Sequence, residues 1–234
     1  MLDATGIMSV SSISFLSGCT VLAMSVVSVY KSMREKTAKL NVRTATALAV
    51  GAALGGAVGK SMFQMLKTDV GNEKAAGMTQ AVVLIVITLG TLIYTFCKKR
   101  IQTKEYTQLR LCFVIGVLLG IMSSFLGIGG GPVNLVVLTY FFSMGMKESA
   151  LSSLYIIMFS RITSLIQTCV TRTIPEVEIS YFIAMVAGGI LGGMLGSKVN
   201  KRIDEDGVNK LFIILMIVIV GINIYNTVKF GVAL

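Results

Sequence analysis

Long apolar segments alternate with short polar connections along almost the whole chain. Seven of them are long enough to cross a bilayer, which takes about 20 predominantly apolar residues per helix. An eighth segment, from Val133 to Met146, is shorter. The pattern predicts an all-α, polytopic membrane protein embedded in the lipid bilayer. The seven long segments are Ile7 to Tyr30, Val42 to Leu66, Met78 to Cys97, Leu109 to Leu126, Leu151 to Val170, Ile179 to Val199 and Val208 to Val228.

A cluster of glycines interrupts the apolar run from Leu111 to Phe142. The interruption holds Gly127, Gly129, Gly130, Gly131 and Pro132. In a helix interior, glycine costs about 1 kcal/mol and proline about 3 kcal/mol relative to alanine, so a continuous helix is not expected. Within a membrane, broken backbone is tolerated only where protein buries it or where it lines a cavity, and transporters build substrate sites this way. We therefore expect a glycine-broken helical hairpin whose second arm runs from Val133 to Met146.

The composition supports the membrane assignment and excludes several kinds of function. Of the 234 residues, 54% are hydrophobic and 14% are charged, whereas about 25% of the residues of a soluble domain are charged. The net charge of +10 comes from basic residues in short connections and not along one polar face, which argues against a nucleic-acid partner. The chain has no histidine, and its four cysteines form no CxxC pair. We expect no metal site and no cofactor.

The charges of the connections predict an orientation. An excess of Lys and Arg in short loops marks the cytoplasmic side of a membrane protein. Residues 31–43 and residues 98–110 each hold five basic residues and one acidic residue, so both loops are expected to be cytoplasmic. The connections 67–77 and 171–178 lack such an excess and are expected outside. The mixed connection 198–210 then returns to the cytoplasm by alternation.

An internal repeat is visible in the positions of glycines and serines. Gly51, Gly55, Gly56 and Gly59 match Gly188, Gly192, Gly193 and Gly196 at a constant offset of 137. The pair Ser11 and Ser12 matches Ser152 and Ser153 at an offset of 141. Because the two matched helices would run in opposite directions, we predict two inverted repeats, residues 1–103 and 104–234, with a site between them near the midplane. Glycines four residues apart also share one helix face and let neighbouring backbones approach closely.

The first repeat has no counterpart of the glycine cluster. Ser152 lies 43 residues after Leu109, whereas Ser11 lies only 10 residues after Met1, so about 33 residues are without an equivalent. Three explanations are open. The start is truncated, a second chain or the other copy of a homodimer supplies the missing element, or the protein works without it.

Arg161 is the sharpest single indication of a binding site. It lies thirteen residues after Glu148 and ten before Thr171, which is roughly 15 Å or more from either end of its helix. A charge at the bilayer centre costs about 2.5 to 3.5 kcal/mol and is a functional residue by default. No Asp or Glu lies deep in any apolar segment, so an anionic ligand can supply the counter-charge. The alternative is structural: Arg161 caps carbonyl groups of the broken helix.

Hydroxyl, amide and backbone N–H groups complete the predicted site. Serines beside Arg161 and on the matched helix can donate hydrogen bonds to an oxyanion, although each can instead bond to its own helix backbone. Pro132 suits the first position of a restarting helix, whose free N–H groups attract anions. The candidate substrate-binding residues are Arg161, Gly127, Gly129, Gly130, Gly131, Asn134, Ser152, Ser153, Tyr155, Ser11 and Ser12.

Several of these motifs resemble a known family. The sequence from Phe125 to Gly131, the stretch from Lys147 to Ser153, the glycine-spaced helix from Gly188 to Gly196 and the start from Asp3 to Ser12 resemble the TauE/SafE sulfite exporter family, also called the toluene sulfonate uptake permease family. The resemblance extends over essentially the whole chain. It implies a transporter of small anions, such as sulfite, sulfonates, sulfoacetate or related organic anions. Family members usually carry the glycine motif in both halves, and here only the second half has it.

The sequence thus favours an anion exporter of the cell membrane that works by alternating access between its two halves. An inside-negative potential favours anion efflux by about 2.3 kcal/mol per charge per 100 mV, so export needs no coupled ion. The alternative is a non-transporting membrane partner or structural subunit. We do not expect an enzyme, because the chain shows no nucleophile paired with a base and no metal-ligand pattern.

Overall fold

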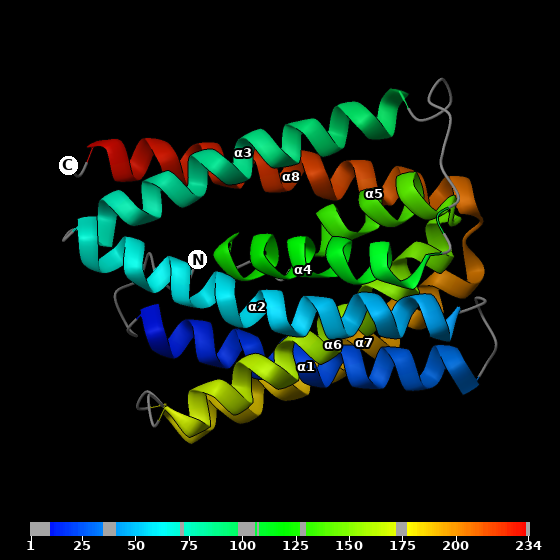
Figure 1. The fold of residues 1–234 in the computed structure, drawn as a ribbon, viewed down its shortest axis with the longest axis horizontal. Helices are drawn as coiled ribbons and strands as arrows, with labels where there is room; N and C mark the ends of the chain where they lie inside the picture. The colour runs from blue at the N-terminus through cyan, green and yellow to red at the C-terminus, as the bar shows by residue number, and fades with distance from the viewer. Residues whose placement is uncertain are drawn as a thin grey trace.

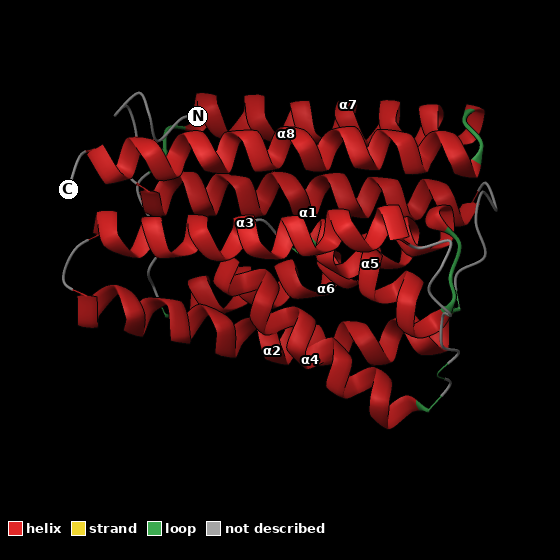
Figure 2. Cartoon of the chain, turned by 90° about the horizontal axis from the view of Figure 1, so that it is seen from above, coloured by secondary structure: helices red, strands yellow, loops and turns green. Residues whose placement is uncertain are grey.

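The computed structural model describes residues 10–34, 41–70, 73–97, 106, 108–126, 130–171 and 177–232. Regular structure in these residues is entirely α-helical, as the hydrophobic pattern predicts. The helices lie side by side as a bundle (Figures 1 and 2). They are α1 (Val10–Arg34), α2 (Val42–Val70), α3 (Glu73–Cys97), α4 (Leu109–Leu126), α5 (Gly131–Phe142), α6 (Met146–Val170), α7 (Ile179–Arg202) and α8 (Glu205–Val232).

Five of the described helices, namely α1, α2, α6, α7 and α8, are long and apolar enough to cross a membrane. The described parts of α3, α4 and α5 are shorter apolar helices. Large apolar side chains cover the outside of the bundle, as in Leu191 of α7 and Ile214 of α8, which are 60% and 58% exposed. An apolar surface of this extent requires lipid around it. The protein is therefore a multi-pass membrane protein.

Helices α4 and α5 form a hairpin that enters and leaves at the same end of the bundle. α4 stops at Leu126, Gly130 adopts φ 69° in the left-handed region, and α5 begins at Gly131. The N–H of Tyr106, just before α4, donates to the carbonyl of Phe141 at the end of α5 at 3.1 Å. Figure 1 shows α5 returning beside α4. The predicted broken hairpin is thus present, although residues 127–129 lie outside the described residues.

The second arm of the hairpin is shorter than predicted. The sequence suggested one element from Val133 to Met146, but α5 ends at Phe142, and Met146 is the first residue of α6. Ser143 has φ 50°, a left-handed conformation that terminates the helix. The new helix is then capped from α8, because the Glu205 carboxylate accepts hydrogen bonds from the N–H groups of Met146 at 2.8 Å and Lys147 at 3.4 Å. The apolar pattern across this junction gave no sign of the turn.

The helix ends that flank the basic connections gather at one end of the bundle. α1 and α3 end there and α2 and α4 begin there, together with the α5–α6 and α7–α8 junctions (Figure 1). Residues 35–40 and 98–105, which hold many of the basic side chains, lie outside the described residues, as does the predicted boundary at residue 103. The opposite end carries the α2–α3 and α6–α7 connections. This arrangement matches the separation of basic and balanced loops in the sequence.

The closest helix contact joins α2 to α4 through interlocking glycines. Gly51, Gly55 and Gly59 on α2 face backbone oxygens of α4, and Gly116 and Gly120 on α4 face backbone oxygens of α2. A Cβ added at any of these five positions would overlap backbone atoms of the partner helix. Small residues allow such close backbone approach between membrane helices, which van der Waals contact then stabilises. The predicted role of the α2 glycines is confirmed.

The matching glycines of α7 behave differently. An added Cβ at Gly188, Gly192 or Gly196 would meet no described atom within 4 Å, so the expectation that this stripe packs against a neighbouring backbone is wrong for the described residues. The close contacts of α7 are made instead by Gly189 and Gly193, which face α1. Four-residue spacing identifies residues that share a helix face, but it does not identify the face that packs against a neighbouring helix. The inverted relation of the two halves and a second chain that supplies the missing N-terminal element stay predictions.

The two glycine stripes supply a matched pair of variants. We expect Gly55→Ala to lower the free energy of unfolding by about 1 to 3 kcal/mol, because the added methyl group forces α2 and α4 apart. Gly192→Ala should leave it unchanged or raise it by up to about 1 kcal/mol through helix propensity. Unfolding in mixed micelles of increasing denaturing-detergent fraction measures both values. Equal losses in the two variants would contradict the packing described for α2 and α4.

Candidate functional site

Polar groups from four helices converge where the α4–α5 break meets α2 and α6. The break places the last turn of α4 beside the first turn of α5, and α2 brings its glycine face against α4. α6 packs against α1, α2 and α5. The break is therefore surrounded by protein, as broken backbone within a membrane requires.

Gly130, Ser123 and Asn134 form the innermost part of this site. A Cβ on Gly130 would lie 2.8 Å from the Ser123 hydroxyl and 3.0 Å from Asn134 Oδ1, so both side chains point at this glycine. Asn134 is 2% exposed, and its Oδ1 has no hydrogen-bond partner among the described residues. A buried amide without a partner is costly, and a carboxamide can both donate and accept. The side chain of Asn134 thus has an unused hydrogen-bonding group that is available to a ligand.

The start of α5 adds backbone groups to the same place. Pro132 occupies the first turn, and Gly130 at the N-cap provides no side-chain cap for the leading N–H groups. An uncapped helix N-terminus carries a partial positive charge and binds anions. The predicted combination of a glycine break, a restarting helix and an amide from Asn134 is therefore assembled within one turn of helix. Gly131 belongs to this turn, whereas Gly127 and Gly129 lie outside the described residues.

A second polar contact joins α4, α2 and α6 at Gly56. A Cβ at this position would lie 3.0 Å from the Ser160 hydroxyl and 3.1 Å from the Ser124 hydroxyl. The missing side chain of Gly56 thus leaves room for two hydroxyl groups, one from α6 and one from the last turn of α4. Ser160 is 8% exposed, so this contact is buried inside the bundle.

Two cations follow directly after this contact along α2 and α6. Lys60 lies one turn after Gly56, and its Nζ donates to Thr168 Oγ1 at 2.7 Å. Arg161 follows Ser160 on α6, which packs against α2 along this interface. Thr168 is seven residues after Arg161, which is two turns later on the same helix face. Arg161, Lys60 and Thr168 therefore line one polar stripe of the α2–α6 interface.

No carboxylate of the surrounding helices compensates these two charges. Helices α1, α4 and α5 contain no acidic residue. The acids of α2 and α6 are Asp69 and Glu148, nine residues after Lys60 and thirteen residues before Arg161. A single cation in the bilayer interior already costs about 2.5 to 3.5 kcal/mol. Two neighbouring cations without a counter-ion on these helices make the region strongly attractive to an anion.

The predicted residues of early α6 lie away from Arg161. Ser152 and Ser153 are buried near the other end of the helix, and the Ser152 hydroxyl donates to Met144 Sδ at 3.7 Å. Tyr155 makes a hydroxyl contact with Thr46 of α2 at 3.4 Å. Ser152 is nine residues from Arg161, about 13.5 Å along the helix axis. These groups extend the polar stripe between α2 and α6 but do not surround the guanidinium.

The serines of α1 do not meet those of α6. α1 and α6 run antiparallel, with Gly18 opposite Leu165 (Figure 1). Ser12 is buried near one end of α1. Because the two helices are antiparallel, Ser12 and Ser152 are separated by about 28 Å along the helix axes. Antiparallel packing therefore separates the two serine pairs that the repeat predicted to act together. The side chain of Ser11 lies outside the described residues.

Sequence reasoning missed Lys60, Thr168, Ser123 and Ser124. The predicted apolar segment ends at Leu66, only six residues after Lys60, whereas α2 continues for ten residues beyond Lys60 to Val70. Groups of three or more His, Cys, Asp or Glu that could hold a metal ion are absent from the described residues.

The family of the protein follows from a comparison with known sequences. A family model described as "Sulfite exporter TauE/SafE" matches residues 4–224. The chain belongs to the TauE/SafE sulfite exporter family. The resemblance seen in its motifs is thereby confirmed, and this TauE/SafE protein is a member of a family of membrane exporters. Searches among curated proteins and among solved structures each found no match.

The glycine break provides a test of the geometry. Gly130→Ala should lower the free energy of unfolding by at least about 1 to 2 kcal/mol, because alanine is strained at φ 69° and its methyl group would overlap Ser123. Gly131→Ala is the matched control, since an added Cβ there meets no described atom within 4 Å. Thermal unfolding of the purified protein in detergent compares the two variants. A Gly130→Ala protein as stable as the control would contradict the left-handed turn.

Proposed function

We propose that this TauE/SafE protein exports a small oxyanion, such as sulfite, a sulfonate, sulfoacetate or a related organic anion. The observation that carries the proposal is the polar stripe between α2 and α6. Lys60 of α2 donates there to Thr168, Arg161 lies two turns away on the same face of α6, and neither helix has a nearby carboxylate. An oxyanion between them would supply the negative charge that the protein lacks. Charge-assisted hydrogen bonds to an oxyanion are about twice as strong as neutral ones.

The binding path in this proposal follows the stripe between α2 and α6. The uncapped start of α5 and the Nδ2 amino group of Asn134 bind the anion at the break, and Arg161 and Lys60 attract it from the end where α6 terminates. The hydroxyls of Ser124 and Ser160 meet at Gly56 between these two regions. Alternating access then requires α6 to move relative to α2 and α4, so that this contact opens.

The direction of transport follows from the charges. With the basic end of the bundle in the cytoplasm, an anion released beyond Lys60 leaves the cell. The inside-negative potential favours this movement by about 2.3 kcal/mol per charge per 100 mV. The second candidate, a non-transporting membrane partner, has no specific observation in its favour and becomes an outcome of the transport test.

The role of the cations is tested by anion flux in proteoliposomes. We expect Arg161→Gln to lower the initial rate of radiolabelled sulfite transport at least tenfold, because a charge-assisted hydrogen bond contributes about 1.5 to 3 kcal/mol. Arg110→Gln, which removes an exposed arginine at the start of α4, should transport at close to the wild-type rate. Elution as a single species from size exclusion verifies folding of both variants. Equal flux in all three proteins would contradict the site, and no anion flux in the wild type would favour the non-transporting alternative.

Lys60 should affect the charge preference of transport more than its maximum rate. In Lys60→Gln, we expect the rate for doubly charged sulfoacetate to fall several-fold more than that for singly charged methanesulfonate, because one of two positive charges is lost. Lys60→Arg, which keeps the charge, should retain the wild-type preference. Competition of the two unlabelled anions against radiolabelled sulfite measures the ratio. An unchanged preference between the two anions in Lys60→Gln would contradict a role for Lys60 in the anion path.

Two native cysteines report the orientation. Cys97 ends α3 at the basic end of the bundle, and Cys169 lies next to the last residue of α6 at the opposite end; both are exposed. In intact cells, a membrane-impermeant maleimide should label Cys169 and leave Cys97 unlabelled, whereas inside-out vesicles should give the reverse. Cys169→Ser and Cys97→Ser assign each signal. Labelling of Cys97 from outside would invert the proposed topology.

A further inference from the structure

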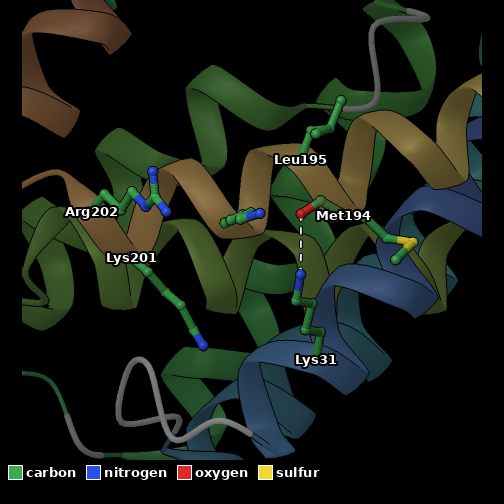
Figure 3. A pocket seen from close by; sticks show the side chains of 6 residues that line it. Lys31, Met194, Leu195, Lys201 and Arg202 are labelled. Atoms are coloured by element: carbon green, nitrogen blue, oxygen red, sulfur yellow. Dashed lines mark hydrogen bonds between the residues drawn. The ribbon is translucent and has the colours of Figure 1, made fainter.

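A basic surface pocket lies at the end of the bundle where α1 and α7 terminate, away from the anion path. Its volume is about 550 Å³, and its lining residues are Lys31, Met194, Leu195, Lys198, Lys201 and Arg202. Figure 3 shows Lys31 reaching from α1 to the backbone of α7, where its Nζ donates to the carbonyl of Met194 at 3.2 Å. The pocket therefore combines four cations from two helices with two apolar side chains.

Two of the nearby acids hold backbone N–H groups. Asp204 Oδ1 accepts a hydrogen bond from the Gly207 N–H at 2.9 Å, and the Glu205 carboxylate caps the start of α6. Basic residues in the last turn of a helix complement its dipole, which accounts for Lys201 and Arg202. Lys31 complements the dipole of α1 in the same way, because it lies in the last turn of that helix. The dipoles do not account for the convergence of side chains from both helices on one hollow. The hollow is thus lined by cations from two helices, which favours an external anion.

An exposed face of α7 that contains two glycines leads away from this pocket. Leu195 lines the pocket and is 63% exposed, and it shares a helix face with Gly188, Gly192 and Arg202. At both glycines, the space that a Cβ would occupy has no described atom within 4 Å. This open glycine face thus starts at a cationic pocket. A phospholipid matches this arrangement, because its anionic phosphate is attached to an apolar acyl chain.

We propose that this pocket binds the phosphate headgroup of an anionic phospholipid whose acyl chain lies along the glycine face of α7. Basic pockets between membrane helices bind acidic lipid headgroups in this way. Lys31 keeps two further N–H donors after its bond to Met194, and Arg202 presents a guanidinium fork that fits phosphate oxygens. The site explains why the stripe of Gly188 and Gly192 is open: the lipid chain covers it instead of another helix.

The proposal is tested by titrating the detergent-solubilised full chain with phosphatidylglycerol or phosphatidylcholine and counting bound lipids by native mass spectrometry. Lys198→Gln combined with Arg202→Gln should weaken phosphatidylglycerol binding roughly 20- to 30-fold, since each basic contact near a lipid surface contributes about a fivefold factor. Lys147→Gln combined with Lys210→Gln removes the same charge at the same end outside the pocket and should change binding less than about threefold. Gly192→Leu, which adds a side chain to the open glycine face, should weaken lipid binding without removing any charge.

Each other outcome overturns the lipid site. Equal weakening in the two double variants would show diffuse attraction to the basic end, and no weakening in either would exclude the pocket. Equal binding of phosphatidylcholine and phosphatidylglycerol to the wild type would exclude recognition of the anionic headgroup. Displacement of phosphatidylglycerol by an equal concentration of glycerol 3-phosphate would show a site for free phosphate. Unchanged lipid binding in Gly192→Leu would contradict the placement of the acyl chain along the glycine face of α7.

Discussion

The contact between α2 and α4 is the constraint on which the rest of the arrangement depends. Glycines from both helices alternate along it, and each faces a backbone oxygen of the partner. Lipid offers no hydrophobic driving force for helix association, so this contact is stabilised by dispersion between closely spaced backbones. It holds α4 at a fixed height against α2, which places the last turn of α4 beside Gly56 and brings the break within reach of α6. Without it, Ser124 and Ser160 would not share one position.

The sequence was most informative where local chemistry decides the structure. The bounds of α4, Leu109–Leu126, agree with the predicted segment because a glycine cluster ends it. The predicted gathering of Gly130, Gly131 and Asn134 follows for the same reason, since one turn of helix joins them. The end of α5 was missed although Ser143 and Gly145 stand at the turn, because a single serine and a single glycine also occur inside helices.

The hydrophobic pattern did not predict contacts between segments that are distant in the sequence. Lys60 and Thr168 are 108 residues apart, and their hydrogen bond depends on how α2 crosses α6. The repeat correctly identified similar glycine stripes on α2 and α7, but their surroundings differ because α4 covers one stripe and α1 packs on another face of α7. Periodicity determines which residues share a face. Tertiary packing determines what that face meets, and it separated the serines of α1 and α6 that the repeat had paired.

The length of α5 has an electrical consequence. Its 12 residues span at most about 18 Å, whereas the hydrocarbon core of a bilayer is about 30 Å thick. An anion at Gly130 would therefore lie a little beyond the middle of the insulating layer, counted from the basic end. The membrane voltage falls over the same layer, so loading and release would each experience roughly half of the potential difference. In the proposed transport cycle, the place where this helix breaks would thus divide the work of the electric field between loading and release.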